Sequence, residues 1–302
     1  MKSKPLVSII VPNYNHARFL DERLQSILNQ TYQNFELIIL DDKSDDNSLE
    51  IINRYKDNSH VSQIFINEEN SGSVFLQWEK GMMSAKGDLI WIAESDDFAE
   101  SSQLESLVSL FDDNKVILAF CRSQLINEKS EVFFTNNQSD LHGSFIMDSH
   151  LFIKCHLQRR NVIENASSVI FRKEAAIKVR NRYRELKGAG DWLFWIGLCQ
   201  NEGKVAFIEE ALNYYRKHVH SQTSLMDKTG GNIREGKYIY DYLLSNQLIS
   251  EEDYQENRFN QLRFIKNNIK DKQLRYELIN LWQGGIKFYI KDILLRICHR
   301  LS

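Results

Sequence analysis

Short apolar runs alternate with amphipathic helical segments over the first hundred residues of this 302-residue chain. The runs are rich in Val, Ile and Leu, which is typical of strands covered on both faces, whereas the segments between them repeat apolar side chains at helical spacing. The predicted strands cover residues 6–11, 35–40, 61–67 and 88–93. The predicted helices cover residues 19–28, 48–55 and 74–85. This alternation predicts an α/β fold with a mostly parallel sheet flanked by helices.

The remainder of the chain is less regular and then becomes helical. Further strands and helices are expected at 116–122, 167–171 and 205–208, and at 104–111 and 191–199, respectively. Residues 127–143 are polar and irregular, which favours a hairpin or an extended edge. From about residue 224 the sequence is charged and helical, so we expect a C-terminal helical appendage.

Polar residues follow three of the predicted strands, at the point where each strand ends. These loops lie at residues 12–15, 41–48 and 94–97. Parallel strands present their carboxyl ends at one edge of the sheet, and ligands of open α/β sheets bind beyond that edge. The three loops are therefore expected to converge on one site.

The third loop carries the strongest chemical signal. Glu94, Asp96 and Asp97 place three carboxylates within four residues. Neighbouring carboxylates repel one another unless a cation or hydrogen bonds offset the repulsion. Because oxygen ligands favour hard ions, the motif predicts Mg²⁺ or Mn²⁺ bound between protein carboxylates and substrate phosphates. For the motif taken alone, a solvated acidic loop after an ordinary strand is the alternative.

Composition and charge narrow the class of protein. With 42% hydrophobic residues and a net charge of −3, the chain is globular in composition and lacks the basic surplus of nucleic-acid-binding proteins, so no nucleic-acid partner is predicted. Its four cysteines are widely spaced and are expected to be reduced thiols. No apolar run reaches the ~18 residues of a membrane span, and residues 6–11 are too few for a signal sequence. A cytoplasmic protein is expected.

Five motifs occur in the order and spacing of glycosyltransferase family 2. They are Val7–Asn15, Leu40–Ser44, Asn70–Gly72, Ala85–Asp88 and Glu94–Asp97. The chain resembles this family over about residues 5–125, and more loosely as far as His218. The resemblance implies a GT-A fold over residues 1–223, with a nucleotide-binding half at about 5–125 and an acceptor half at about 126–223. Residues 224–302 form the helical C-terminal region outside it.

The resemblance also implies roles for residues of the three loops. Asp96 would be the direct metal ligand, with Asp97 assisting. Glu94, where the family more often has Asp, would contact the donor ribose or the metal shell. Asp41 would accept a hydrogen bond from a uracil or thymine base, with helix capping as its alternative. The donor pocket would further contain Pro12, Tyr14, Asn15 and Ser95, although plain packing also explains Tyr14.

Three later residues complete the implied site. Asp191 lies where the family has its catalytic base, and a helix N-cap is the alternative. Arg216 and His218 resemble the family's late basic and histidine motif near the diphosphate, and a structural histidine is the alternative for His218. Many relatives carry an arginine after the Asn-x-Gly motif, but none follows Gly72 here. Phosphate charge would then be met by the metal and by Lys80, Arg216 or His218.

Together these residues imply an inverting, metal-dependent glycosyltransferase with Mn²⁺ or Mg²⁺ as cofactor. The donor would be a UDP or dTDP sugar and the acceptor a glycan or lipid-linked glycan, as in bacterial surface polysaccharide biosynthesis. The missing arginine and Glu94 leave open a catalytically silent relative that binds sugar nucleotide as an interaction module. A nucleotidyltransferase ranks last because no glycine-rich phosphate loop follows the first predicted strand.

The C-terminal segment 286–301 alternates apolar residues with lysine and arginine in a helical pattern. An amphipathic basic helix can lie on anionic lipid, which would place the protein at the inner face of the cytoplasmic membrane. Packing on its own domain or on a second subunit explains the segment equally well. A peripheral membrane contact and a homodimer therefore both stay open.

Overall fold

The structure is a computed structural model that describes residues 4–135, 141–218, 226, 228–285 and 288. The chain divides into two compact units. The first comprises residues 1–185 and 190–218, and the second comprises residues 186–189 and 219–302.

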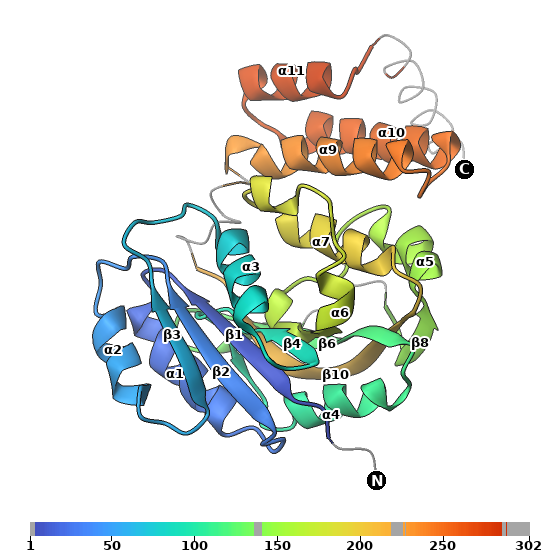
Figure 1. The fold of residues 1–302 in the computed structure, drawn as a ribbon. Coiled ribbons are helices and arrows are strands. Elements are labelled where there is room, and N and C mark those ends of the chain that lie inside the picture. Colours follow the sequence, from blue (N-terminus) through green and yellow to red (C-terminus); the bar gives the residue numbers. More distant parts are fainter. Residues whose placement is uncertain (1–3, 136–140, 219–225, 227, 286–287, 289–302) are drawn as a thin grey trace. The chain divides into compact units, whose positions relative to one another are not determined.

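The first unit is built on a ten-stranded sheet among the described residues (Figure 1). Its strand order is β3-β2-β1-β4-β9-β6-β10-β5, with β7 beside β6 and β8 beside β10. The strands are β1 (Val7–Asn13), β2 (Phe35–Asp41), β3 (Val61–Ile66), β4 (Leu89–Ile92), β5 (Phe98–Ala99), β6 (Val116–Ile126), β7 (Val132–Thr135), β8 (Phe145–Asp148), β9 (Val169–Arg172) and β10 (Lys204–Arg216). The helices are α1 (Ala17–Leu28), α2 (Ser48–Tyr55), α3 (Val74–Ser84), α4 (Gln103–Ser109), α5 (Ser149–Phe152), α6 (Lys173–Ala176) and α7 (Gly190–Cys199).

Strands β1 to β4 have the parallel order that the sequence predicts. β1 pairs in parallel with β2 and with β4, and β2 pairs in parallel with β3. All seven residues of β1 and of β2 are buried, as expected for strands covered on both faces. The carboxyl ends of β1, β2 and β4 consequently meet at one edge of the sheet, where the three polar loops begin.

Helices cover both faces of these strands (Figure 1). On one face, alternate residues such as Ile9 and Trp91 pack in a core with Leu24 of α1 and Leu104 of α4. On the other face α3 lies close to β1, because Gly81 leaves room for Ile10: a Cβ at Gly81 would lie 2.4 Å from the Ile10 side chain. This packing fixes the loops at the ends of the strands.

The rest of the sheet, from β5 to β10, is mixed rather than parallel. β9 runs antiparallel to both β4 and β6, and β10 is parallel to β6 but antiparallel to β5 and β8. The strand predicted at 205–208 is the first part of β10, which continues through register shifts to Arg216. The strand predicted from 167 begins at Val169, after a 3₁₀ turn at Ala166–Ser168. A hairpin does form after β6, as expected, through β7.

The second unit contains the helices α9 (Gly231–Ser245), α10 (Glu251–Asn268) and α11 (Lys272–Leu281). Ser250 caps α10 through a reciprocal capping box with Asp253, and Trp282 is fully buried beside Tyr240. None of the helices in the described parts of the chain combines the length and apolar character that a membrane crossing needs. The predicted membrane-contact segment 286–301 lies outside the described residues except for Phe288.

Candidate active site

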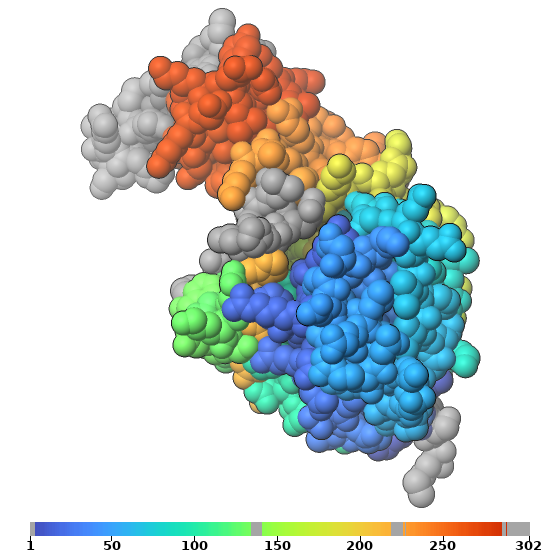
Figure 2. All heavy atoms as spheres, turned by 90° about the vertical axis from the view of Figure 1, so that its left-hand side faces the viewer, coloured from blue at the N-terminus to red at the C-terminus, as the bar shows by residue number. Residues whose placement is uncertain are grey.

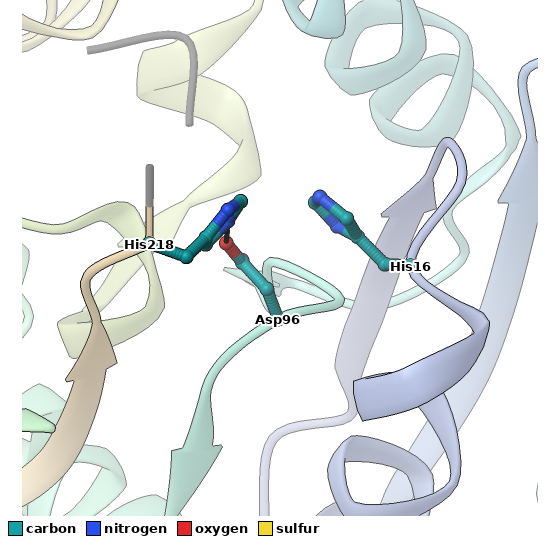
Figure 3. Close-up of side chains that lie close together, drawn as sticks. All are labelled: His16, Asp96 and His218. Atoms are coloured by element: carbon teal, nitrogen blue, oxygen red, sulfur yellow. Dashed lines mark hydrogen bonds and ion pairs between the residues drawn. The ribbon is translucent and has the colours of Figure 1, made fainter. Parts of the chain in front are cut away.

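Three segments far apart in the sequence meet at the carboxyl ends of β1, β4 and β10. His16 follows β1, Asp96 follows β4 and His218 follows β10. Their side chains point toward one another (Figure 3), and one ligand atom from each lies within 4.8 Å of the other two. The structure thus brings together the predicted residues Asp96 and His218, and it adds His16, which the sequence analysis missed.

Hydrogen bonds orient this group. His218 Nε2 lies 3.1 Å from Asp96 Oδ2, and His16 Nδ1 lies 2.8 Å from Ser95 Oγ. Because Ser95 holds Nδ1, the His16 ring is oriented with Nε2 as its ligand atom. Burial opposes the charge of Asp96, but the hydrogen bond from His218 and the nearby His16 outweigh it, so the pKa of Asp96 lies below its ordinary value. Asp96 is therefore ionised at neutral pH, as a metal ligand would need to be.

This donor set fits a divalent transition metal. Imidazole nitrogens are ligands of divalent transition metals, whereas Mg²⁺ prefers oxygen ligands alone. The remaining coordination positions would be free for water and for substrate phosphates. Of the two ions predicted from sequence, Mn²⁺ suits the two imidazoles better than Mg²⁺ does.

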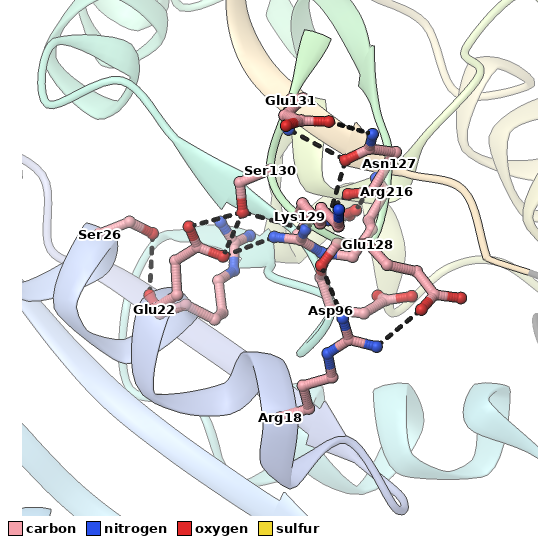
Figure 4. A network of polar contacts seen from close by, with 12 residues as sticks. Arg18, Glu22, Ser26, Asp96, Asn127, Glu128, Lys129, Ser130, Glu131 and Arg216 are labelled. Atoms are coloured by element: carbon pink, nitrogen blue, oxygen red, sulfur yellow. Dashed lines mark hydrogen bonds and ion pairs between the residues drawn. The ribbon is translucent and has the colours of Figure 1, made fainter. Parts of the chain in front are cut away.

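Arg216 has a different environment from the one predicted. Its side chain is fully buried, and its Nε donates to the backbone oxygen of Asp96 at 2.6 Å. Its Nη atoms donate to Glu22 Oε2 at 2.5 Å, to the backbone oxygen of Asn127 and to Ser130 Oγ (Figure 4). With four protein acceptors, this guanidinium is not presented to a diphosphate. The structure instead makes Arg216 a brace between α1, the β6–β7 turn and the Asp96 loop.

The brace continues at the surface. Arg18 of α1 pairs with Glu128 of the β6–β7 turn at 2.6 Å, and Ser130 donates to Glu22 at 2.9 Å. In the space-filling view, the green surface of this hairpin lies beside the blue surface of α1 (Figure 2). The turn is thus tied to α1, the helix that begins directly after His16.

Asp97 lies beneath the surface and is surrounded by protein donors. Its Oδ2 accepts from Asn165 Nδ2 at 2.9 Å and from Ser167 Oγ at 2.6 Å, while its Oδ1 accepts from the Arg216 backbone at 2.9 Å. Burial, followed by the charge of Asp96, raises the pKa of Asp97 to about 6. These contacts assign Asp97 to the support of the loop, whereas the sequence prediction made it an assisting metal ligand.

The Glu94 carboxyl group is hydrogen-bonded to Trp78. Trp78 Nε1 donates to Glu94 Oε1 at 2.9 Å, and the Glu94 backbone donates to Ser167 Oγ at 3.0 Å. Burial and then the charge of Asp96 raise the pKa of Glu94 to about 8, against the opposing effect of the Trp78 hydrogen bond. Glu94 is therefore mostly protonated at neutral pH and can donate a hydrogen bond to a ribose or phosphate oxygen.

The second polar loop is anchored by its two aspartates. Asp41 is fully buried, and its carboxylate accepts from Asn13 Nδ2 at 2.8 Å and from the backbone and hydroxyl of Ser44. Asp42 accepts from Asn67, Ser71 and Gln77 and so holds the loop that leads to α3. Neither residue caps a helix. Asp41 orients Asn13, whose Oδ1 is buried without a hydrogen-bond partner among the described residues.

The remaining predicted donor-pocket residues lie on the first loop. Pro12 is buried in β1 beside Leu40, and Tyr14 is 47% exposed. Asn15 has a positive φ of 56° and accepts from the Asp45 backbone, which joins the first loop to the second. Tyr14 is thus exposed enough to stack on a ligand.

Asp191 lies in the first turn of α7, as predicted. Its Oδ2 accepts from Asn161 Nδ2 at 2.8 Å, and its Oδ1 accepts from its neighbour Trp192 at 2.7 Å. Gly190 permits this helix start, since a Cβ there would lie 2.5 Å from the backbone oxygen of Tyr183. The asparagine fixes the carboxylate in one orientation, which a general base requires.

Lys80, one of the predicted partners of phosphate, contacts side chains of the first unit. Its Nζ donates to Asn67 Oδ1 at 2.7 Å and lies 4.9 Å from the centre of the Phe65 ring. Of the three predicted phosphate partners, His218 belongs to the candidate ligand group, whereas Arg216 contacts the Asp96 backbone and Lys80 contacts Asn67.

The family is decided by sequence comparison. The model of glycosyl transferase family 2 matches residues 8–180, more than half of the chain. The chain belongs to glycosyl transferase family 2. Asp191, Arg216 and His218 lie beyond the matched segment.

Relatives from this family match parts of the chain. An uncharacterized glycosyltransferase of Haemophilus influenzae is 38% identical over 122 residues, covering 39% of this chain and 48% of that protein. The poly(ribitol-phosphate) β-N-acetylglucosaminyltransferase TarS of Staphylococcus aureus is 23% identical over 257 residues, covering 82% of this chain and 38% of TarS. This chain thus spans about half or less of these two relatives' lengths.

Solved structures show the same fold. A TarS structure in complex with UDP-GlcNAc has a TM-score of 0.66 at 19% identity and covers 91% of this chain and 79% of that chain. The mannosyltransferase PcManGT from Pyrobaculum calidifontis, in complex with GDP-Man and Mn²⁺, has a TM-score of 0.60 at 13% identity and covers 99% and 81%. The fold is GT-A, as the sequence predicts.

Proposed function

We propose that this protein is a metal-dependent, inverting glycosyltransferase that moves a sugar from a nucleotide-diphosphate sugar to a glycan or lipid-linked glycan. The observation that carries the proposal is the convergence of His16, Asp96 and His218 at the edge of the sheet where nucleotides bind. Sugar-nucleotide complexes of two structural neighbours, one with UDP-GlcNAc and one with GDP-Man and Mn²⁺, support it.

The nucleotide would bind across the ends of β1 and β2. Asn13 and Asp41 form the floor there, and Tyr14 offers an exposed ring for stacking on a base. Uracil or thymine suits this floor, because each base carries one N–H between two carbonyl groups and Asn13 has an unpartnered amide oxygen. We therefore retain a UDP or dTDP sugar as the donor.

The diphosphate would lie beside the metal-ligand group. Asp96, His16 and His218 would hold Mn²⁺, which when bound supplies Lewis-acid neutralisation of the departing diphosphate. Glu94 of the same loop, held by Trp78, would contact the donor ribose or the metal shell. The dication would then supply the positive charge that the arginine missing after Gly72 gives in many relatives.

Asp191 is the proposed general base. Its carboxylate, oriented by Asn161, would remove the proton from the acceptor hydroxyl as that oxygen attacks the anomeric carbon. Attack from the face opposite the leaving diphosphate inverts the configuration at this carbon.

The acceptor and the location are further parts of the proposal. TarS is named for transfer of N-acetylglucosamine to poly(ribitol-phosphate), which supports a surface polymer as the class of acceptor. We propose action in the cytoplasm at the inner face of the membrane, where lipid-linked glycans are accessible, with segment 286–301 as the contact.

Nucleoside diphosphate release tests the proposal. The protein would be incubated with a panel of sugar nucleotides and glycan acceptors in Mn²⁺, in Mg²⁺ and in EDTA. We expect release with one donor, faster in Mn²⁺ than in Mg²⁺ and abolished by EDTA and by Asp96→Asn. Equal release by the Asp96→Asn variant would contradict the metal site.

A catalytically silent relative is the second candidate, because the guanidinium of Arg216 is taken up by protein acceptors. Calorimetry separates the two functions. Sugar-nucleotide binding without turnover across the acceptor panel would establish the silent relative.

A further inference from the structure

Arg23 is the most unusual side chain near the acidic loop. It lies in α1 with no exposed surface, and none of its three guanidinium nitrogens has a hydrogen-bond partner among the described residues. A buried guanidinium normally saturates its donors, as Arg216 does in the same unit. An unpaired buried charge costs several kcal/mol, so the surroundings of Arg23 must compensate for it.

The compensation comes from one aromatic ring and from nearby negative charge. The Arg23 guanidinium carbon lies 4.9 Å from the centre of the Trp91 ring, a cation–π contact between α1 and β4. Asp97 is the carboxylate with the largest electrostatic effect on Arg23, followed by Glu94 and Asp96. None of the three carboxylates accepts a hydrogen bond from the guanidinium in the described structure, so these charges interact over a distance longer than a direct hydrogen bond.

Unpaired acceptors lie in the network around these carboxylates. Gln103 Oε1 and Asn213 Oδ1 are both buried without a partner among the described residues. Gln103 donates to the Ser167 backbone oxygen, which Trp91 also contacts, and Ser167 donates to Asp97. Orphan donors and orphan acceptors in one buried polar network are the conditions in which ordered water bridges them.

We propose that Arg23 is the internal counter-ion of the Glu94–Asp97 loop, joined to Asp97 through buried water, and that it holds this loop in shape whether or not a dication is bound. The role is one of positioning, because the guanidinium is sealed from solvent and reaches no ligand. It explains how three carboxylates fold together before a metal arrives.

A double-mutant cycle tests the proposal. Thermal unfolding would be measured in EDTA for Arg23→Met, Asp97→Asn and the double variant, with Arg23→Lys as the conservative variant. We expect Arg23→Met to lower the Tm by roughly 5–10 °C in the wild-type background and by less than half as much in the Asp97→Asn background. Arg23→Lys, which keeps the charge, should recover part of the loss.

Two outcomes of this cycle would overturn the proposal. If Arg23→Met is as stable as the wild type, or if its effect is the same with and without Asp97→Asn, Arg23 only fills space against Trp91. Should Asp97→Asn fail to fold, the same cycle is run with Asp96→Asn, whose carboxylate is less buried than that of Asp97.

The same Tm measurements with Mn²⁺ added distinguish a failure of this inference from a failure of the proposed function. These measurements rest on the proposed metal site. Mn²⁺ should raise the Tm of Arg23→Met by more than that of the wild type, because the dication takes over the missing positive charge. A smaller Mn²⁺ shift in Arg23→Met contradicts the counter-ion role. No Mn²⁺ shift in either protein contradicts the metal site, while the cycle in EDTA still decides the role of Arg23.

Discussion

His218 Nε2 lies 3.1 Å from Asp96 Oδ2, although 122 residues separate the two in the sequence. The contact joins the end of β10 to the loop after β4. It places an imidazole outside the segment matched by the family model beside the acid that the family motif identifies. The candidate ligand group is therefore assembled from distant parts of the first unit.

Removing one member of this group should weaken metal binding. We expect Asp96→Asn and His218→Ala each to lower Mn²⁺ affinity by about tenfold or more in calorimetry, since each deletes a ligand. His16→Ala should also lower the preference for Mn²⁺ over Mg²⁺, because the remaining site is richer in oxygen.

His150→Ala is the matched control, since this histidine is exposed on α5. Unchanged Mn²⁺ affinity in all three site variants would remove His16, Asp96 and His218 from the metal site. A loss confined to Asp96→Asn would leave the histidines as structural residues.

Asp191→Asn should separate chemistry from binding. The amide cannot accept a proton, so we expect kcat to fall by about 10²–10⁴ while the dissociation constant of the sugar nucleotide changes little. Steady-state nucleotide release and calorimetry measure the two quantities.

Asn161→Ala extends this test to the residue that orients the base. It should reduce kcat by a smaller factor than Asp191→Asn, because the carboxylate remains but loses one hydrogen bond. If Asp191→Asn retains full activity with the true acceptor, another group is the base.

Strands β1 to β4 were predictable because the sequence patterns that identify them are local. Strands such as β1 and β2 are buried on both faces and so appear in the sequence as unbroken apolar runs with polar residues at their ends. Their parallel pairing then follows from the helices between them. The place of Asp96 at the edge of the sheet could be inferred from these features alone.

Strand β10 and the hydrogen bonds that support the Asp96 loop were harder to predict, because the partner residues are distant in the sequence. β10 was expected as a short strand, since its polar residues Glu209 and Glu210 interrupt the apolar run while pairing with β6 continues beyond them. Arg216 donates a hydrogen bond to Glu22, 194 residues away, and Asp97 accepts one from Asn165, 68 residues away. Residue type and spacing do not encode such pairs. His16 had one usable signal, its place directly after the Asn13–Asn15 loop.

Glu94 should make the stability of the metal-free protein depend on pH. Its pKa is about 8 in the folded state against an ordinary value of 4.5, so between these values the folded protein holds a proton that the unfolded chain releases. Stability from this group is full below about pH 4.5 and is lost as the pH rises through 8. In EDTA, the wild-type Tm should fall between pH 5 and 8.5 by several degrees more than that of Glu94→Gln.

The Glu94→Gln substitution removes the titratable group but keeps the hydrogen bond, because a glutamine oxygen can still accept from Trp78 Nε1. Asp97 contributes in the same direction in both proteins, so the difference between the two curves reports Glu94. Parallel curves would show that Glu94 is ionised in the folded protein at neutral pH.

Arg216→Met should damage both stability and metal binding. The substitution leaves the backbone oxygens of Asp96 and Asn127 without this buried donor, and a hydrogen bond to a charged group contributes about 1.5–3 kcal/mol. Because the same guanidinium fixes the Asp96 loop, Mn²⁺ affinity should also fall, by about tenfold. Chemical denaturation and calorimetry measure the two effects.

Arg18→Met provides the comparison for this brace. Arg18 also bridges α1 to the β6–β7 turn, but its side chain is 60% exposed, and an exposed pair contributes less than about 1 kcal/mol. We therefore expect Arg18→Met to unfold close to the wild type and to bind Mn²⁺ normally. If Arg216→Met loses stability but binds Mn²⁺ like Arg18→Met, the brace supports the fold without positioning Asp96. If Arg216→Met keeps its stability and loses sugar-nucleotide binding instead, Arg216 contacts the diphosphate, as the sequence analysis predicted.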